Sequence, residues 1–259
     1  RQWLNTNPDA AIALLALSER DSNQARFFGR LGETLRTEVP AFDPTAFTPF
    51  DAGNNENPAD IAEALRQGLA GVCHPVVVVI DDFQHLAGRP LILDTFNYLL
   101  ESPPECLRLL IASRAEPELR LSQLHLHNQL TELTHEDLRF STAETRQLCQ
   151  ALDQARVSEN TLDHLLRLTE GWVTGLRLAL LAARRSGEEA LDTFAGHQPD
   201  VMAYFGDMVL RGLPDSLRSL CLQSSLFDRM TGPLCDQVLR HSGSALMLEE
   251  LARQQLFVM

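Results

Sequence analysis

The chain has 259 residues, 44% of them hydrophobic, and a formal net charge of −13 at pH 7. This length allows two or three domains with a sizeable core. No apolar run approaches the roughly 20 residues that a membrane-spanning helix needs, which excludes a membrane protein. Because a DNA-binding domain usually presents a basic face, the negative charge also argues against DNA binding by this chain itself.

The cysteine and lysine content of the chain excludes several kinds of site. Five cysteines are scattered along the chain without a CxxC pair. This indicates free thiols in a cytoplasmic protein, not a disulfide framework or a zinc site. All 22 basic side chains are arginine. The sequence therefore has neither a GxxxxGK(S/T) phosphate-binding loop nor the lysine with which that loop reaches the β and γ phosphates.

The first 140 residues predict strands and helices in alternation. Strands are expected at 11–17, 76–80 and 107–112, with 130–133 as a candidate fourth. Helices are expected at 23–35, 59–69 and 90–100, the first of them capped by Asp21 or Ser22. Residues 38–58, rich in Pro, Asn and Asp, predict a long exposed loop. Such alternation predicts an α/β fold with a parallel sheet and helices on both faces.

The central stretch of the sequence is PVVVVIDDFQHL at residues 75–86. Its apolar run has no period-2 alternation, which predicts a strand buried on both faces. Asp81 and Asp82 follow directly, where open α/β sheets bind their ligands. Four hydrophobic residues and then Asp are also the pattern of a Walker B strand, whose aspartate helps to hold Mg²⁺ on a nucleotide. The alternative is a core strand that ends in solvated acids, because such runs are common.

From about residue 141 the pattern becomes helical. Ser141 and Glu144 have the spacing of a capping box, and Gly171 separates two of the helices. Helices are expected at 143–152, 159–168, 172–184, 201–211, 214–223, 233–240 and 244–254, with a glycine-containing acidic break at 186–200. The short apolar end LFVM, following helices, predicts a winged-helix-type module. The predicted domains are an α/β core at 1–140, a small helical domain at 141–195 and a winged-helix-type domain at 196–259.

His125 and His127 are the remaining candidate metal ligands. On a strand, residues two apart face the same way, as metal ligands can. No third ligand is evident nearby, so the sequence favours a polar loop at this place.

Five segments, in this order, resemble the nucleotide-binding part of the MalT-like regulators: VVVVIDDFQHL at 76–86, LLIASRAEP at 109–117, LTELTHEDLRF at 130–140, EGWVTGLRLAL at 170–180 and VLRGLPDSLRSLCLQSSLF at 209–227. Members of that family are ATP-binding transcriptional activators of the LuxR type, in the STAND class of P-loop NTPases. The resemblance implies a P-loop NTPase-type α/β core without its P-loop, followed by a small helical domain and a winged-helix-type domain.

The resemblance also implies roles for individual residues. Asp81 matches the Walker B aspartate that acts on Mg²⁺, and Asp82 matches the neighbouring acid that positions the attacking water. Arg114 matches an arginine that reads the γ-phosphate, for which a guanidinium offers a planar fork of donors. Gly171 and Trp172 match a glycine-led motif at a helix start that packs near the adenine, where glycine allows close backbone approach. The ordinary alternatives are a surface arginine at Arg114 and a core anchor at Trp172.

The family pattern extends beyond this chain. Its Walker A loop precedes the part matched here, and a superhelical repeat domain and a LuxR-type helix-turn-helix follow it. The sequence is therefore interpreted as a fragment of a signal-responsive regulator switched by ATP and ADP with Mg²⁺. The resemblance implies self-association of the complete regulator, a small-molecule inducer, and contacts with DNA and RNA polymerase only through domains outside this chain.

Two other functions remain open at this stage. One is a degenerate NTPase fold that serves as a protein-interaction scaffold, and the other is an AAA+-like ATPase. As for catalysis, the resemblance implies at most a slow, switch-type ATPase in the complete protein. The fragment itself is expected to be inactive, because the backbone NH cradle and the lysine of the P-loop supply most phosphate contacts.

Overall fold

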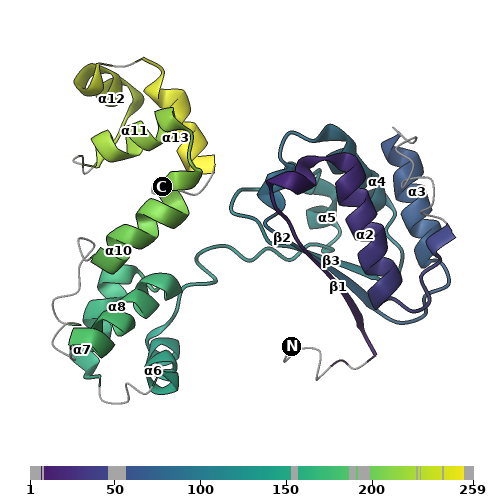
Figure 1. Ribbon diagram of the computed structural model, residues 1–259, viewed down its shortest axis with the longest axis horizontal. Coiled ribbons are helices and arrows are strands. Elements are labelled where there is room, and N and C mark those ends of the chain that lie inside the picture. Colours follow the sequence, from purple (N-terminus) through teal and green to yellow (C-terminus); the bar gives the residue numbers. More distant parts are fainter. Residues whose placement is uncertain are drawn as a thin grey trace. The chain divides into compact units, whose positions relative to one another are not determined.

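The structure is a computed structural model that describes residues 7, 9–45, 57–152, 157–186, 191, 199–225, 227, 229–240 and 242–253. The chain divides into two compact units, Arg1–His127 with Leu248–Met259, and Asn128–Met247. The first contains a sheet with its helices, and the second is helical (Figure 1). We describe each unit by itself.

Three parallel strands form the sheet, in the order β1-β2-β3. They are β1 (Ala11–Ala16), β2 (Val76–Asp81) and β3 (Leu107–Ile111). In register, Val79 of β2 pairs with Leu14 on one side and Leu110 on the other. The prediction of an α/β fold with a parallel sheet is confirmed.

The candidate fourth strand at 130–133 was wrong. These residues are all described and form no strand, and the side chain of Leu133 is 70% exposed. A strand is stable only where a neighbour pairs with its backbone groups. The run at 130–133 belongs to the second unit, whereas the sheet β1-β2-β3 belongs to the first.

The helices of the first unit follow the predicted order. They are the 3₁₀ turn η1 (Glu19–Ser22), α2 (Gln24–Glu38), α3 (Pro58–Leu69), the 3₁₀ turn η3 (Phe83–Leu86), α4 (Pro90–Glu101) and α5 (Ser122–Leu126). The cap of α2 is Asn23, whose Oδ1 accepts the N–H of Arg26 at 3.0 Å. The predicted caps Asp21 and Ser22 were wrong, because both belong to η1.

Two further expectations concern loops of this unit. Most of the predicted loop at 38–58 lies outside the described residues. The predicted polar loop around His125 is instead the short helix α5, with His127 at its C-cap. Residues two apart on a helix point in different directions, so the two imidazoles do not face one site.

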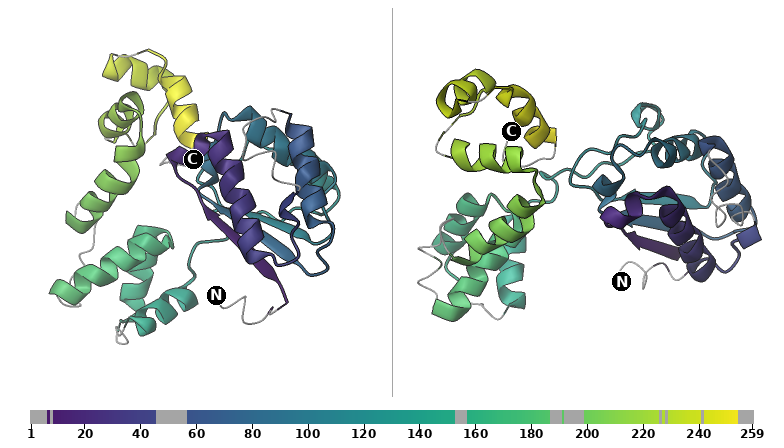
Figure 2. Two further views of the ribbon diagram at one scale, coloured as in Figure 1. Left: turned by 45° about the vertical axis from the view of Figure 1, so that its right-hand side comes forward. Right: turned by 45° about the horizontal axis from the view of Figure 1, so that its top comes forward.

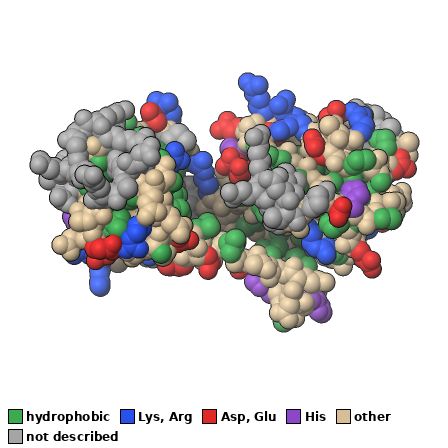
Figure 3. All heavy atoms as spheres, turned by 90° about the horizontal axis from the view of Figure 1, so that it is seen from below, with side chains coloured by type: hydrophobic (Ala, Val, Ile, Leu, Met, Phe, Trp, Pro, Cys, Tyr) green, Lys and Arg blue, Asp and Glu red, His purple; other side chains and the backbone are tan. Residues whose placement is uncertain are grey.

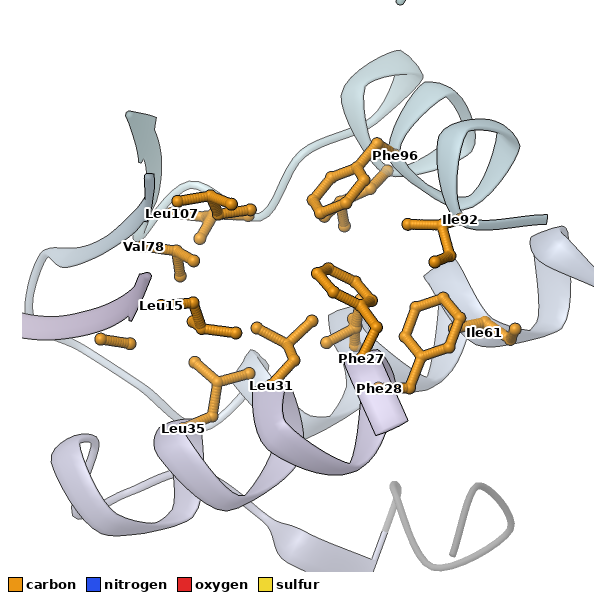
Figure 4. Packing of buried hydrophobic residues seen from close by; sticks show 14 of the residues in the cluster. Leu15, Phe27, Phe28, Leu31, Leu35, Ile61, Val78, Ile92, Phe96 and Leu107 are labelled. Atoms are coloured by element: carbon orange, nitrogen blue, oxygen red, sulfur yellow. The ribbon is translucent and has the colours of Figure 1, made fainter. Parts of the chain in front are cut away.

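One face of the sheet carries the core of this unit. Phe27 of α2 packs edge-on against Phe96 of α4, with their ring centroids 5.9 Å apart. Strand residues of one parity share this core (Figure 4), namely Ala13, Leu15, Val76, Val78, Ile80 and Leu107. In the views of Figures 1 and 2, α2, α3 and α4 lie together on that side of the strands.

The opposite face of the sheet is open within the described part of this unit. Its apolar side chains are Ile12, Leu14, Val77, Val79 and Leu110, which we call the open sheet face, and the exposed Arg108 lies on the same face. Leu14 is 61% and Leu110 is 50% exposed. This corrects the expectation of helices on both faces and of a doubly buried β2. The strand order runs in one direction, and right-handed crossovers in one direction all return on the same side.

The second unit is built from helices. They are α6 (Thr142–Ala151), α7 (Glu159–Thr169), α8 (Val173–Ser186), α10 (Pro199–Tyr204), the π-helical turn η4 (Phe205–Val209), the 3₁₀ turn η5 (Leu210–Gly212), α11 (Asp215–Ser224), α12 (Gly232–Leu239) and the start of α13 (Ser244–Arg253). The residues of α13 from Leu248 onward belong to the first unit. The predicted capping box is present, because Ser141 N–H donates to Glu144 at 2.9 Å and Glu144 N–H to Ser141 Oγ at 3.3 Å.

A small core holds α6, α7 and α8 together, formed by Cys149, Leu162, Leu165, Leu176, Ala179, Leu180 and Ala183. All five cysteines of the chain are free thiols, as predicted. No helix in the described part of the chain is long and apolar enough to cross a membrane. The predicted terminal strand, and most of the break at 186–200, lie outside the described residues.

Candidate functional site

The candidate site lies at the carboxyl edge of the sheet, where β2 ends in two acids. Asp81 is the last residue of β2 and its side chain is exposed. Its carbonyl oxygen accepts the N–H of Leu17 at 3.0 Å, which ties it to the end of β1. Its Oδ1 accepts the N–H of Asp82 at 3.0 Å. The second carboxylate oxygen of Asp81 therefore remains at the edge for a cation.

Asp82 has an unusual backbone conformation. Its φ of 57° and ψ of 43° place it in the left-handed region, which non-glycine residues seldom adopt. Aspartate tolerates this region better than most residues, and such strain is concentrated at functional sites. The left-handed residue turns the chain sharply from β2 into η3. As a result, the Asp82 side chain stays half-buried at the strand end.

Arg114 follows β3 and meets Asp82 from the neighbouring strand. Its Nε lies 3.8 Å from Asp82 Oδ1, and its side chain is 64% exposed. At this distance and exposure the ion pair contributes little to stability. The guanidinium is therefore held loosely and remains free to turn toward a ligand. The structure thus brings together three residues selected from the sequence: Asp81, Asp82 and Arg114.

Gln84 in η3 is a fourth member of this cluster, and sequence reasoning missed it. Its Nε2 donates to Asp82 Oδ1 at 2.9 Å, and its Oε1 accepts the N–H of Arg114 at 3.2 Å. The amide thus bridges the ends of β2 and β3. Only its position two residues after the paired acids hints at this role in the sequence. The contact with Arg114 joins positions 30 residues apart, so no local pattern predicts it.

Backbone hydrogen bonds fix the frame of the site. Ala112 N–H donates to Ile80 O at 2.9 Å, and Phe83 N–H donates to Ala112 O at 3.0 Å. Farther along, Gly88 N–H donates to Glu118 Oε2 at 3.1 Å. The turn after β2 and the loop after β3 are therefore held side by side.

A buried ion-pair cluster lies at the end of β1. Asp21 is completely buried, and its Oδ1 lies 2.7 Å from Arg30 Nη1 and 3.1 Å from Arg26 Nε. Its Oδ2 accepts Ser18 N–H at 2.9 Å and Ser18 Oγ–H at 2.7 Å. Burial by itself raises the pKa of Asp21, but hydrogen bonds from Arg30, Ser18 and Arg26 outweigh it and hold that pKa well below its usual range. Arg30 also donates to Ala16 O at 3.1 Å.

Gly171 and Trp172 lie in the second unit. Gly171 has a φ of 75°, and a Cβ there would come within 2.7 Å of Phe140 O. The rings of Tyr204 and Phe205 lie 5.6 and 5.7 Å from that of Trp172, which is 39% exposed. Close packing against Phe140 explains the glycine, and the aromatic cluster explains the tryptophan as an anchor of this unit.

Within the described residues, no group of three or more His, Cys, Asp and Glu side chains could hold a metal ion. This does not argue against magnesium on a nucleotide, which needs only one or two carboxylates besides phosphate and water ligands. The exposed carboxylate of Asp81 fits that requirement. The half-buried carboxylate of Asp82 and the loosely paired guanidinium of Arg114 fit an anionic ligand beside it.

An α/β sheet with charged side chains at its carboxyl edge, followed by helices, defines a broad class of ligand-binding proteins. Comparison with protein families narrows this class, because residues 206–259 match the MalT winged helix domain. This part of the chain contains α11, α12 and α13. The match supports a winged-helix-type domain at the end of the chain.

Whole-chain comparison gives the same family. Two proteins called "HTH-type transcriptional regulator MalT", from Klebsiella pneumoniae subsp. pneumoniae and from Klebsiella pneumoniae strain 342, are each 27% identical to this chain. Each alignment covers 99% of this chain and 29% of the relative. The resemblance to MalT-like regulators that the sequence predicted is thus confirmed. The chain spans less than a third of the length of these relatives.

Proposed function

We propose that this chain is the nucleotide-binding and oligomerisation module of a transcriptional activator that ATP and ADP switch between two states. The observation that carries this proposal is the convergence of Asp81, Asp82 and Arg114 at the carboxyl edge of a parallel sheet, in a chain similar to MalT throughout. This edge is where open α/β sheets bind ligands.

Each residue has a distinct part in the proposed site. Asp81 presents an exposed oxygen to the Mg²⁺ ion that would accompany a nucleotide, and the ion would neutralise phosphate charge. Asp82 accepts a hydrogen bond from a water molecule and orients it toward the terminal phosphate. Arg114 leaves its loose pairing with Asp82 and donates to the γ-phosphate. Because ADP lacks that phosphate, Arg114 distinguishes the two nucleotides.

The described residues supply one part of such a site. A phosphate chain also needs a cradle of backbone N–H groups, which a glycine-rich loop and a helix N-terminus provide in P-loop proteins. We infer that another segment of the longer polypeptide supplies that cradle. Two features of the described residues support this inference, namely the open sheet face and the edge of β3 opposite β2, which pairs with no described strand. Both leave room beside the sheet for a further strand and helix.

The module would act as a switch, with slow hydrolysis at most. Nucleotides can shift a two-state equilibrium only if the states bind ATP and ADP with different affinities. Arg114 supplies that difference in affinity, because it contacts the γ-phosphate of ATP and finds no such group on ADP.

We further propose that a small-molecule inducer biases the equilibrium and that the ATP-bound state self-associates. DNA and RNA polymerase would be contacted through domains outside this chain.

Titration calorimetry of the full-length protein with ATP and with ADP, in the presence of Mg²⁺, tests the proposal. We expect both nucleotides to bind and Asp81→Ala to remove the dependence on Mg²⁺. If neither nucleotide binds and Asp81→Ala leaves transcriptional activation unchanged, the chain is a scaffold with a degenerate NTPase fold. Rapid steady-state turnover, far above that of a switch, would instead favour an AAA+-like motor.

A further inference from the structure

Gln84 lies between Asp82 and Arg114, two of the three charged groups of the proposed site. It lies in η3, is half-buried, and makes one hydrogen bond to each neighbouring strand end. Its Nε2 lies 2.9 Å from Asp82 Oδ1, and its Oε1 lies 3.2 Å from the backbone nitrogen of Arg114. Both separations are normal hydrogen-bond distances.

The chemistry of the two partners fixes the orientation of this amide. An ionised carboxylate only accepts hydrogen bonds, and a backbone N–H only donates. The NH₂ group of Gln84 must therefore face Asp82, and its carbonyl must face Arg114. The flipped amide would place oxygen against oxygen at Asp82 and two donors against each other at Arg114. Gln84 consequently holds the Asp82 side chain and the Arg114 backbone at one fixed separation.

The hydrogen bonds of Gln84 come in addition to backbone hydrogen bonds that already connect the ends of β2 and β3. Ala112 N–H to Ile80 O and Phe83 N–H to Ala112 O hold the strand ends together without Gln84. Loss of the amide should therefore leave the fold intact and alter only the positions of Asp82 and of the Arg114 backbone. The Arg114 side chain is more exposed than that of Asp82, so its position depends strongly on what anchors its backbone.

We propose that Gln84 is the positioning residue through which Asp82 and Arg114 respond together to the terminal phosphate, so that discrimination of ATP from ADP depends on it. This inference rests on the proposed nucleotide site. Gln84 itself does not touch the phosphate. It fixes the backbone from which Arg114 reaches the γ-phosphate, and it keeps Asp82 beside that path.

The test measures the ATP and ADP affinities of the full-length protein by calorimetry in Mg²⁺, for wild type, Gln84→Ala, Arg114→Ala and the double variant. Gln67→Ala is the matched control. Gln67 is also a glutamine of this unit, and its amide donates to the carboxylate of Glu63 at 3.2 Å, away from the strand ends. Thermal unfolding of each variant reports whether the fold is kept.

We expect Gln84→Ala to lower the ATP-over-ADP preference about five- to tenfold, the order of one lost hydrogen bond. ADP affinity and thermal stability should stay near those of wild type, and Gln67→Ala should change neither affinity. Since Gln84 acts through Arg114, adding Gln84→Ala to Arg114→Ala should cause no further loss of preference.

Three results would overturn the inference while leaving the proposed nucleotide site standing. They are an unchanged preference in Gln84→Ala, an equal loss of ATP and ADP affinity, and losses that add in the double variant. If the wild-type protein binds neither nucleotide, the proposed function fails, and this inference fails with it.

Discussion

At the scale of single residues, Asp21 is the strongest case of an ion pair that stabilises the fold. Its buried carboxylate is surrounded by Ser18, Arg26 and Arg30. Asp21→Asn should lower the free energy of unfolding by about 2–4 kcal/mol, because the carboxylate charge between two guanidinium groups is lost. Denaturant unfolding measures this loss.

Asp43→Asn is the control for that variant. Asp43 is exposed and accepts hydrogen bonds from its neighbour Thr45, so the change should cost less than about 1 kcal/mol. If both variants lower the free energy of unfolding equally, the buried ion pair at Asp21 contributes no more to stability than the exposed Asp43 does.

Asp21 also predicts that the stability of the fold depends on pH. Hydrogen bonds from Arg30, Ser18 and Arg26, which outweigh the opposing effect of burial, make the pKa of Asp21 lower in the folded than in the unfolded state. The stabilisation is therefore complete above the unfolded pKa of about 4 and is lost as the pH falls toward the folded pKa. The difference in unfolding free energy between wild type and Asp21→Asn should shrink below about pH 4. A constant difference from pH 7 to pH 2 would contradict the assignment.

Asp82 should matter for hydrolysis more than for binding. In the full-length protein, Asp82→Asn should lower ATP turnover about 100-fold, the usual contribution of a group that orients or deprotonates water. ADP affinity should stay within about twofold, because Asp81 would still hold the metal. Asp94→Asn, which changes a half-buried carboxylate 3.5 Å from Arg120, is the control. Unchanged turnover in Asp82→Asn would remove Asp82 from the proposed chemistry.

The sequence predicted which charged residues would meet at the strand ends, but not what holds them. Asp81 and Asp82 follow an apolar run, and Arg114 follows the next one, so parallel pairing brings them to one edge. The bridge made by Gln84 depends on the left-handed turn at Asp82, which no side-chain pattern encodes. The capping of α2 by Asn23 was missed for a related reason, because Asp21 is drawn into its own turn by Ser18.

At the level of helices and strands, the three strands of the sheet were predictable to within a residue or two because their apolar runs are strong. The short helix α5 was not predicted, and the helix expected at 23–35 continues to Glu38. The surroundings of the sheet were not predictable either. The run at residues 76–80 is as apolar as a doubly buried strand, yet Val77 and Val79 belong to the open sheet face. The apolar residues of a strand reflect how deeply it is buried in the complete polypeptide. Strand β2 is more apolar than its observed burial requires, which supports a further segment packed on the open sheet face.

A charge on the open sheet face tests that interpretation. In the full-length protein, Leu110→Glu should lower the free energy of unfolding by about 1–3 kcal/mol, because a covered carboxylate loses its hydration. Leu126→Glu is the matched control, since Leu126 lies on α5 and is 80% exposed. Equal and small effects of the two variants would show that the face stays in water.

For the whole molecule, the net charge of the chain argues against DNA recognition by the chain itself. The chain carries a net charge of −13, and acidic and basic side chains are interspersed on the face shown in Figure 3. Even the winged-helix segment at 206–259 has five arginines against six acidic residues. This balance does not predict the basic surface that duplex binding requires.

We therefore expect this 259-residue chain to bind duplex DNA no more tightly than about 10⁻⁴ M at physiological salt. Fluorescence anisotropy with a labelled duplex, repeated at several salt concentrations, measures this. Micromolar binding that weakens steeply with salt would contradict the assignment of DNA contacts to domains outside the chain.

In the proposed site, the carboxyl edge of the sheet binds a magnesium nucleotide and reads its terminal phosphate through Arg114. Calorimetric titration of the full-length protein and its Arg114→Ala variant with ATP and ADP in Mg²⁺ tests both parts of this proposal. We expect both nucleotides to bind the wild type, and we expect Arg114→Ala to weaken ATP binding about tenfold or more while ADP binding is unchanged. Binding of neither nucleotide, or equal weakening of both, would contradict it.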